Sequence, residues 1–104
     1  MVPFAGYEMP VQYTGVLDET RAVRAAAGLF DVSHMGQFRV TGHEPLAAVQ
    51  ALVTNDLSRL SLGQAQYNIL TNPEGGAIDD LVVYHRAPGE TFICVNASNR
   101  QRDF

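Results

Sequence analysis

Two adjacent aspartates, Asp79 and Asp80, are the residues of this sequence best suited to chemistry. They interrupt an apolar run, rich in β-branched residues, that predicts a strand over residues 78–85. Aspartate is disfavoured in strands, and burying a carboxylate is costly unless it is paired or hydrogen-bonded. Because adjacent strand residues face opposite sides, at most one of the two points to solvent if one face is covered. The other is a candidate functional group.

Two tyrosines are candidate partners of this carboxylate. If Leu70 pairs with Ala77 across the intervening turn, Tyr67 lies opposite Asp80, and Tyr84 lies on the same face as both. Two tyrosines and a carboxylate could hold a flat heteroaromatic ligand by stacking and by charge-assisted hydrogen bonding. A register slip of one residue would bring the neighbouring aspartate there instead. The alternative is that both aspartates only end the turn and lie at a sheet edge.

Other reactive residues give weaker signals. Asp31, Ser33 and His34 are close in sequence, but catalytic triads are assembled in space, and no glycine pattern of a nucleophile elbow surrounds the serine. A turn in which Asp31 and Ser33 bond nearby backbone amides is the favoured interpretation. Cys94 is predicted to be a buried structural thiol. No metal site is expected, since three residues share no metal-ligand spacing: His34, His43 and His85.

The elements that must position these residues follow from hydrophobic periodicity and turn signals. Helices are predicted over residues 18–27 and 44–52, strands over residues 35–41, 66–70, 78–85 and 92–95, and a further helix start near residue 98. This order predicts an α+β fold, with an antiparallel sheet and helices on one face.

Composition narrows the classes of function. With 104 residues, 46% hydrophobic residues and a net charge of −4, the chain is typical of one globular domain. Basic residues are few and scattered, so no nucleic-acid partner is expected. No apolar run approaches the roughly 20 residues of a membrane span, and no signal peptide is expected. The single cysteine suits a reducing compartment.

Several strings resemble the amino-terminal part of the glycine-cleavage T-protein family, the folate-dependent aminomethyltransferases. The most specific are GLFDVSHMG at residues 28–36 and GGAIDDLVVY at residues 75–84. The other matching segments follow in the family's order: residues 1–13, 54–56, 66–67 and 95–99, and Asp103. The resemblance therefore covers nearly the whole chain.

The resemblance implies a reaction and a set of residues. Family members pass the aminomethyl group on the lipoyl arm of H-protein to tetrahydrofolate, their co-substrate, and release ammonia. The family's key catalytic carboxylate matches Asp80, which can orient the folate and stabilise positive charge on the aminomethyl carbon. Family residues that contact folate match Tyr67 and Tyr84. An apolar wall of the site matches Met35, for which core packing is the alternative, and Asn96 is a candidate polar contact.

The same resemblance sets the expected extent and setting of the chain. Family members have several hundred residues in three domains, so residues 1–104 are expected to be a truncated N-terminal folate-binding domain with little catalysis of its own. Bacterial cytoplasm is the expected compartment, or the mitochondrial matrix in a eukaryote. The alternatives are the folate-binding domain of a related dehydrogenase or demethylase, a non-enzymatic folate-binding accessory protein, or a generic interaction module.

Overall fold

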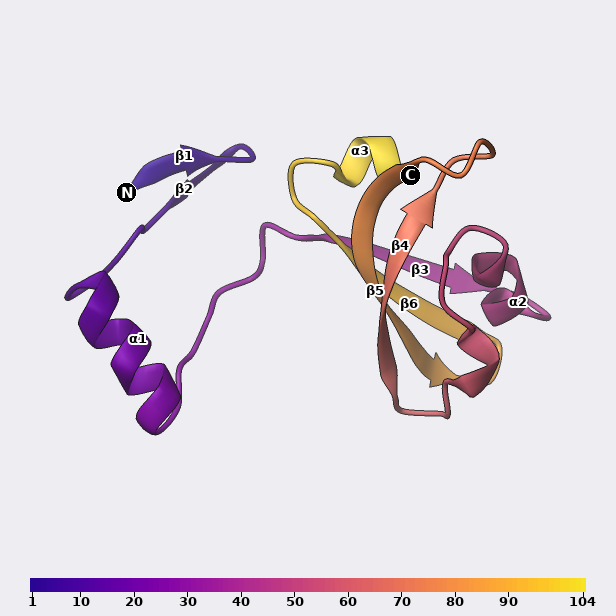
Figure 1. Ribbon diagram of the computed structural model, residues 1–104, viewed down its shortest axis with the longest axis horizontal. Helices are drawn as coiled ribbons and strands as arrows, with labels where there is room; N and C mark the ends of the chain where they lie inside the picture. The colour runs from indigo at the N-terminus through magenta and orange to yellow at the C-terminus, as the bar shows by residue number, and fades with distance from the viewer. The chain divides into compact units, whose positions relative to one another are not determined.

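The chain folds into two compact units, Met1–His34 and Met35–Phe104, in a computed structural model that describes residues 1–104. The larger unit contains a four-stranded sheet (Figure 1). Its strands are β3 (Gly36–Thr41), β4 (Ala65–Thr71), β5 (Ala77–Ala87) and β6 (Glu90–Val95), in the spatial order β3-β6-β5-β4. All neighbouring strands are antiparallel. The four strands predicted from the sequence are confirmed, with ends that differ by only a few residues.

The turn between β4 and β5 departs from the predicted register. Gly75 takes a φ of 81°, which glycine adopts without steric cost, and the turn closes with hydrogen bonds to Asn72. A bulge lies beyond it: Thr71 pairs with Ala77, but Leu70 pairs with Asp79. The predicted pairing of Leu70 with Ala77 is therefore wrong by two residues. Because side chains alternate with a period of two, a slip of two residues keeps every side chain on its predicted face.

One face of the sheet carries the hydrophobic core. The short helix α2 (Pro45–Gln50) and the 3-10 turn η1 (Leu57–Arg59) contribute side chains that pack against this face. The buried cluster consists of Val49, Val53, Leu57, Leu60, Leu70, Leu81, Val83, Ile93 and Val95. The fold is thus α+β, an antiparallel sheet with helices on one face, as the sequence predicts.

A last short helix, α3 (Arg100–Asp103), lies close to the start of β3. A Cβ placed on Gly36 would lie 2.5 Å from Val95 Cγ2 and 2.7 Å from Arg100 Cβ. These distances are shorter than carbon atoms can approach, so only glycine allows this close contact. Asn99 is the residue before the first turn of α3, close to the helix start predicted near residue 98.

The unit Met1–His34 has a different character. It contains a small antiparallel hairpin, β1 (Val2–Phe4) with β2 (Tyr7–Met9), and helix α1 (Val16–Ala25). The sequence did not predict the hairpin. The sequence did predict a helix over residues 18–27, and no residue of the observed α1 is buried.

Candidate functional site

The face of the sheet opposite the core carries the predicted carboxylate. Leu81 and Val83 point into the core, so the alternate residues of β5, Asp80 and Tyr84, lie on the other face. Tyr67 pairs with Val82 and lies on this same face. The prediction that Tyr67, Asp80 and Tyr84 share a face is confirmed. Tyr67 is nevertheless diagonal to Asp80, not directly opposite as predicted.

Asp80 is held by Asn96, the first residue after β6. Asn96 Nδ2 donates hydrogen bonds to Asp80 Oδ1 at 2.9 Å and to the Asp80 backbone carbonyl at 3.1 Å. The same nitrogen lies 3.0 Å from Asp79 Oδ1. A single amide group therefore contacts both adjacent carboxylates, and it restricts the rotation of the Asp80 side chain.

The sheet register brings three predicted site residues to one end of adjacent strands. Gly36 pairs with Val95, which pairs with Leu81 on its other side. The next residues along the chain lie at the same end of these three strands: Met35 precedes Gly36 of β3, Asn96 follows Val95 of β6, and Asp80 precedes Leu81 of β5. Met35 is half-buried, which is compatible both with a site wall and with core packing.

The two tyrosines are accessible to a ligand. Tyr67 is 57% exposed and Tyr84 is 38% exposed. The Tyr84 ring packs edge-on against Phe92, with 5.8 Å between the ring centroids. Partial burial, together with hydrogen bonding to the Asp80 carboxylate and the charges of Asp80 and Asp79, raises the pKa of the Tyr67 phenol. Tyr67 therefore stays a neutral hydrogen-bond donor beside Asp80.

Asp79 lies toward the core side and faces a residue that sequence reasoning did not assign to the site, Asp103 of α3. Burial opposes ionisation of Asp79, but the hydrogen bond from Asn96 and the nearby polar groups of Asn99 and Asp103 outweigh it and lower its pKa. Burial, followed by the hydrogen bond and the charge of Asp79, raises the pKa of Asp103 to about 6. No local pattern predicts this contact, because it joins residues 24 positions apart on different elements.

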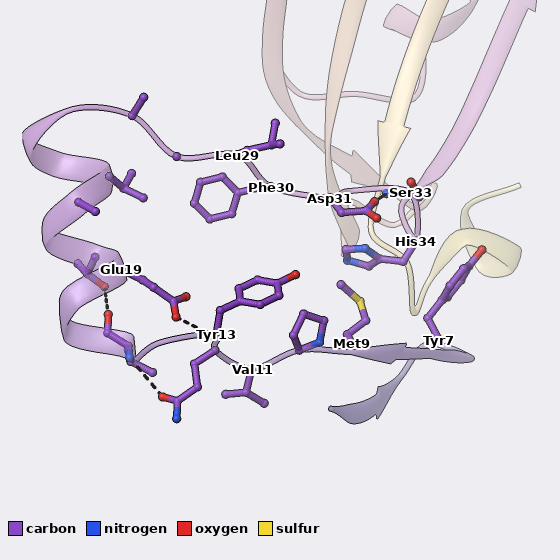
Figure 2. A pocket seen from close by; sticks show the side chains of 18 of the residues that line it. Tyr7, Met9, Val11, Tyr13, Glu19, Leu29, Phe30, Asp31, Ser33 and His34 are labelled. Carbon is purple, nitrogen blue, oxygen red and sulfur yellow. Dashed lines mark hydrogen bonds between the residues drawn. The ribbon is translucent and has the colours of Figure 1, made fainter.

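A separate hollow of about 700 Å³ lies within the unit Met1–His34. The hairpin end, α1 and the segment after it line this hollow, and the rings of Tyr13 and Phe30 project into it (Figure 2). Glu19 Oε1 closes one wall by accepting from the backbone N–H groups of Tyr13 at 2.6 Å and Thr14 at 2.7 Å. None of the predicted site residues lines this hollow.

The local run Asp31, Ser33 and His34 forms a turn, as expected. The Ser33 N–H donates to Asp31 Oδ1 at 2.9 Å, and the His34 ring packs edge-on against Phe4 at 5.7 Å between centroids. No hydrogen bond joins the serine hydroxyl to the histidine. Cys94 is half-buried and pairs with Val82 on the open face, so the thiol is less buried than the sequence predicted.

No group of three or more His, Cys, Asp or Glu side chains is arranged to hold a metal ion. The longest helix has 10 residues, and none of the helices has the length and apolar character needed to cross a bilayer.

Fold and site together define an α+β domain whose antiparallel sheet is covered on one face and carries a clamped carboxylate on the other. The chain matches the GCVT N-terminal domain over residues 1–104, and it belongs to that family. It is 54% identical over its whole length to an aminomethyltransferase of Chlorobium phaeobacteroides, of which it covers 28%. It is 51% identical to an aminomethyltransferase of Thermotoga maritima, of which it covers 29%.

A solved structure has the same fold. The glycine cleavage system aminomethyltransferase T from Bartonella henselae superposes with a TM-score of 0.88 at 38% identity. The match covers 99% of this chain and 29% of that one. The chain thus spans less than a third of the length of the relatives it matches.

Proposed function

We propose that this chain is part of the N-terminal folate-binding domain of a tetrahydrofolate-dependent aminomethyltransferase of the glycine cleavage system. The whole protein would transfer the aminomethyl carbon from the lipoyl arm of H-protein to tetrahydrofolate and release ammonia. The observation that supports this most is the clamped Asp80, which shares an open sheet face with Tyr67 and Tyr84.

The side chains on this face suit a folate. Tetrahydrofolate supplies a flat heteroaromatic ring with N–H donors and a nucleophilic nitrogen that takes up the one-carbon unit. Tyr67 and Tyr84 offer exposed aromatic surface for that ring, and the Asp80 carboxylate offers an acceptor for its N–H groups. Met35 would form an apolar wall at the same end of the sheet, and Asn96 would hold the carboxylate in place.

Asp80 would be the catalytic residue. A carboxylate fixed by Asn96 cannot rotate away, so its negative charge is oriented before the reaction begins. Such a preorganised charge stabilises positive charge that develops on the transferred carbon. The carboxylate also orients the acceptor nitrogen, which lowers the entropic cost of bringing the two reactants together.

The partners and compartment belong to the same proposal. Lipoylated H-protein would be the donor, and neither nucleic acid, nor a membrane, nor a metal ion takes part. The bacterial sources of the relatives favour the cytoplasm. Because the chain spans 28–29% of the length of these relatives, we expect the 104-residue chain alone to have little or no activity.

The test is ammonia release by the full-length protein, meaning the natural polypeptide that contains this chain. We expect release that requires both tetrahydrofolate and aminomethyl-loaded H-protein, and negligible release from the 104-residue chain under the same conditions. An inert full-length protein that still binds tetrahydrofolate would instead identify a folate-binding relative such as a demethylase or an accessory protein. Absence of both activity and folate binding would overturn the proposal.

A further inference from the structure

Two carboxyl groups that the proposed mechanism does not use meet beneath the catalytic one. Asp79 on β5 and Asp103 on α3 have three buried oxygens without a hydrogen-bond donor: Asp79 Oδ2, Asp103 Oδ1 and Asp103 Oδ2. Burying carboxylate oxygens without a donor is costly. A proton held between the two groups lowers this cost, because a protonated carboxyl donates one hydrogen bond.

A close backbone contact brings α3 next to the sheet. Gly36 has no side chain, and α3 therefore packs directly against the start of β3 with Arg100 beside Val95. The Asp103 N–H also donates to the Asn99 carbonyl at 3.0 Å, which fixes the last turn of α3. The backbone of α3 thus places Asp103 beside Asp79, and both of its carboxyl oxygens are buried.

Asn96 connects this pair to the site. Its Nδ2 lies 3.0 Å from Asp79 Oδ1 and 2.9 Å from Asp80 Oδ1. The orientation of the Asn96 amide therefore depends on where the Asp79 carboxylate sits, and the position of Asp80 depends on Asn96.

We propose that Asp103, in its protonated form, is a positioning residue. It fixes the Asp79 carboxylate, which orients the Asn96 amide. The Asn96 amide in turn holds the catalytic carboxylate of Asp80. This inference rests on the proposed folate-binding role of Asp80. The acid hydroxyl of Asp103 donates to the Asp79 carboxylate, whose other oxygen accepts from Asn96.

Loss of the Asp103 proton would weaken the chain of contacts. The groups that face Asp103 are Asp79 and Asp80 from β5 and Arg102 from α3, and the two aspartates favour its protonated form. Once Asp103 ionises, its negative charge lies beside that of Asp79, and Asp79 no longer accepts a hydrogen bond from Asp103. The Asn96 amide is then less constrained, so the orientation of Asp80 and the affinity for folate should both decline.

The first test detects the proton itself, independently of any ligand. In the infrared spectrum of the full-length protein, a protonated carboxyl band should disappear as the pH rises through about 6. The band should be absent from Asp103→Asn and unchanged in Asp18→Asn, a matched substitution at an exposed aspartate of α1. A wild-type spectrum identical to that of Asp103→Asn would overturn the shared proton.

The second test measures the dissociation constant of tetrahydrofolate, under anaerobic conditions, from about pH 5 to about pH 8. Wild-type affinity should fall by roughly 3- to 10-fold across the transition, the scale of one hydrogen bond. Asp103→Asn, which donates at every pH, should keep the affinity of wild type at low pH. Asp103→Ala, which cannot donate, should bind weakly throughout.

The outcomes separate this inference from the proposed function. Equal pH dependence of folate binding in wild type and Asp103→Asn would overturn the positioning role and leave the proposed function standing. If the infrared band behaves as expected but no variant binds folate, the proposed function fails, and with it the link from Asp103 to catalysis. A loss of affinity in Asp103→Asn equal to that in Asp103→Ala would also contradict the inference.

Discussion

The two units of this chain differ in how they use their apolar residues. In Met35–Phe104, nine apolar side chains from β4, β5, β6 and the segments around α2 and η1 form one buried cluster. In Met1–His34, no apolar residue is buried, and most of the large ones are more than half exposed. Both units match the same family over residues 1–104.

The difference teaches that family resemblance and self-sufficient folding are separate properties. The run at residues 28–36 is the most recognisable string of the sequence, yet its hydrophobic residues pack into no core within this chain. Strands β4 to β6, which include most of the second specific string at residues 75–84, bury their side chains and position the candidate site. Stability of the chain should therefore depend mainly on Met35–Phe104.

The largest expected effect compares a leucine from each unit. Leu57 is 1% exposed and Leu17 is 70% exposed. Leu57→Ala leaves a cavity in the core and should lower the free energy of unfolding of the 104-residue chain by about 2–5 kcal/mol. Leu17→Ala should change it by no more than about 0.5 kcal/mol. Urea denaturation followed by circular dichroism measures both, and equal losses would contradict the division into a packed and an unpacked unit.

A second comparison uses one glycine from each unit. A Cβ at Gly36 meets Val95 and Arg100, so Gly36→Ala should destabilise Met35–Phe104 by about 1–3 kcal/mol and displace α3. Gly6 has a φ of 85° but open space around its Cα, so Gly6→Ala strains only the β1–β2 turn. Denaturation curves should shift for the first variant and stay close to wild type for the second. Chemical shifts of Asp103 unaffected by Gly36→Ala would argue against the close contact of α3 with β3.

The smallest effect concerns opposite responses to pH in the two units. Hydrogen bonds from the backbone of Gly15, Thr14 and Tyr13 lower the pKa of Glu19. Its contribution to stability is therefore present above its ordinary value of 4.5 and is lost as the pH falls through the lowered pKa. The raised pKa of Asp103 acts the other way, since stability falls as the pH rises from 3.8 through about 6.

Amide chemical shifts of the 104-residue chain would resolve these two transitions. Residues 13–15 should shift at acid pH in wild type and lose this transition in Glu19→Gln. Residues around α3 should shift near pH 6 and lose that transition in Asp103→Asn. A single transition shared by both regions would contradict the independent behaviour of the two units.

Much of the sheet could be predicted from sequence because its strands carry strong local signals. Residues 81–83 and 92–95, for example, are apolar runs that contain β-branched residues. Gly75 marks the turn between β4 and β5. The register could not be predicted, because the bulge beside Leu70 adds one residue without any distinctive local pattern. The face of Asp80 was still predicted correctly, since the error amounted to two residues.

The candidate site likewise has features that local sequence predicts and features that depend on tertiary packing. The grouping of Tyr67, Asp80 and Tyr84 follows from strand alternation, which is a local property. The clamp by Asn96 was only partly anticipated and the contact between Asp79 and Asp103 was not, because both depend on how β6 ends and where α3 packs. The exposure of α1 could not be predicted for a related reason: an amphipathic pattern predicts a helix but not the presence of a partner.

The most direct test of the central claim is the rate of ammonia release by full-length Asp80→Asn beside wild type, with tetrahydrofolate and aminomethyl-loaded H-protein. The substitution keeps the size of the side chain and removes its charge, and Asp18→Asn serves as the control for an exposed aspartate. A fall of about a hundredfold or more, with the control unchanged, is the predicted result for loss of a preorganised charge. A rate within about twofold of wild type would contradict the catalytic role of Asp80.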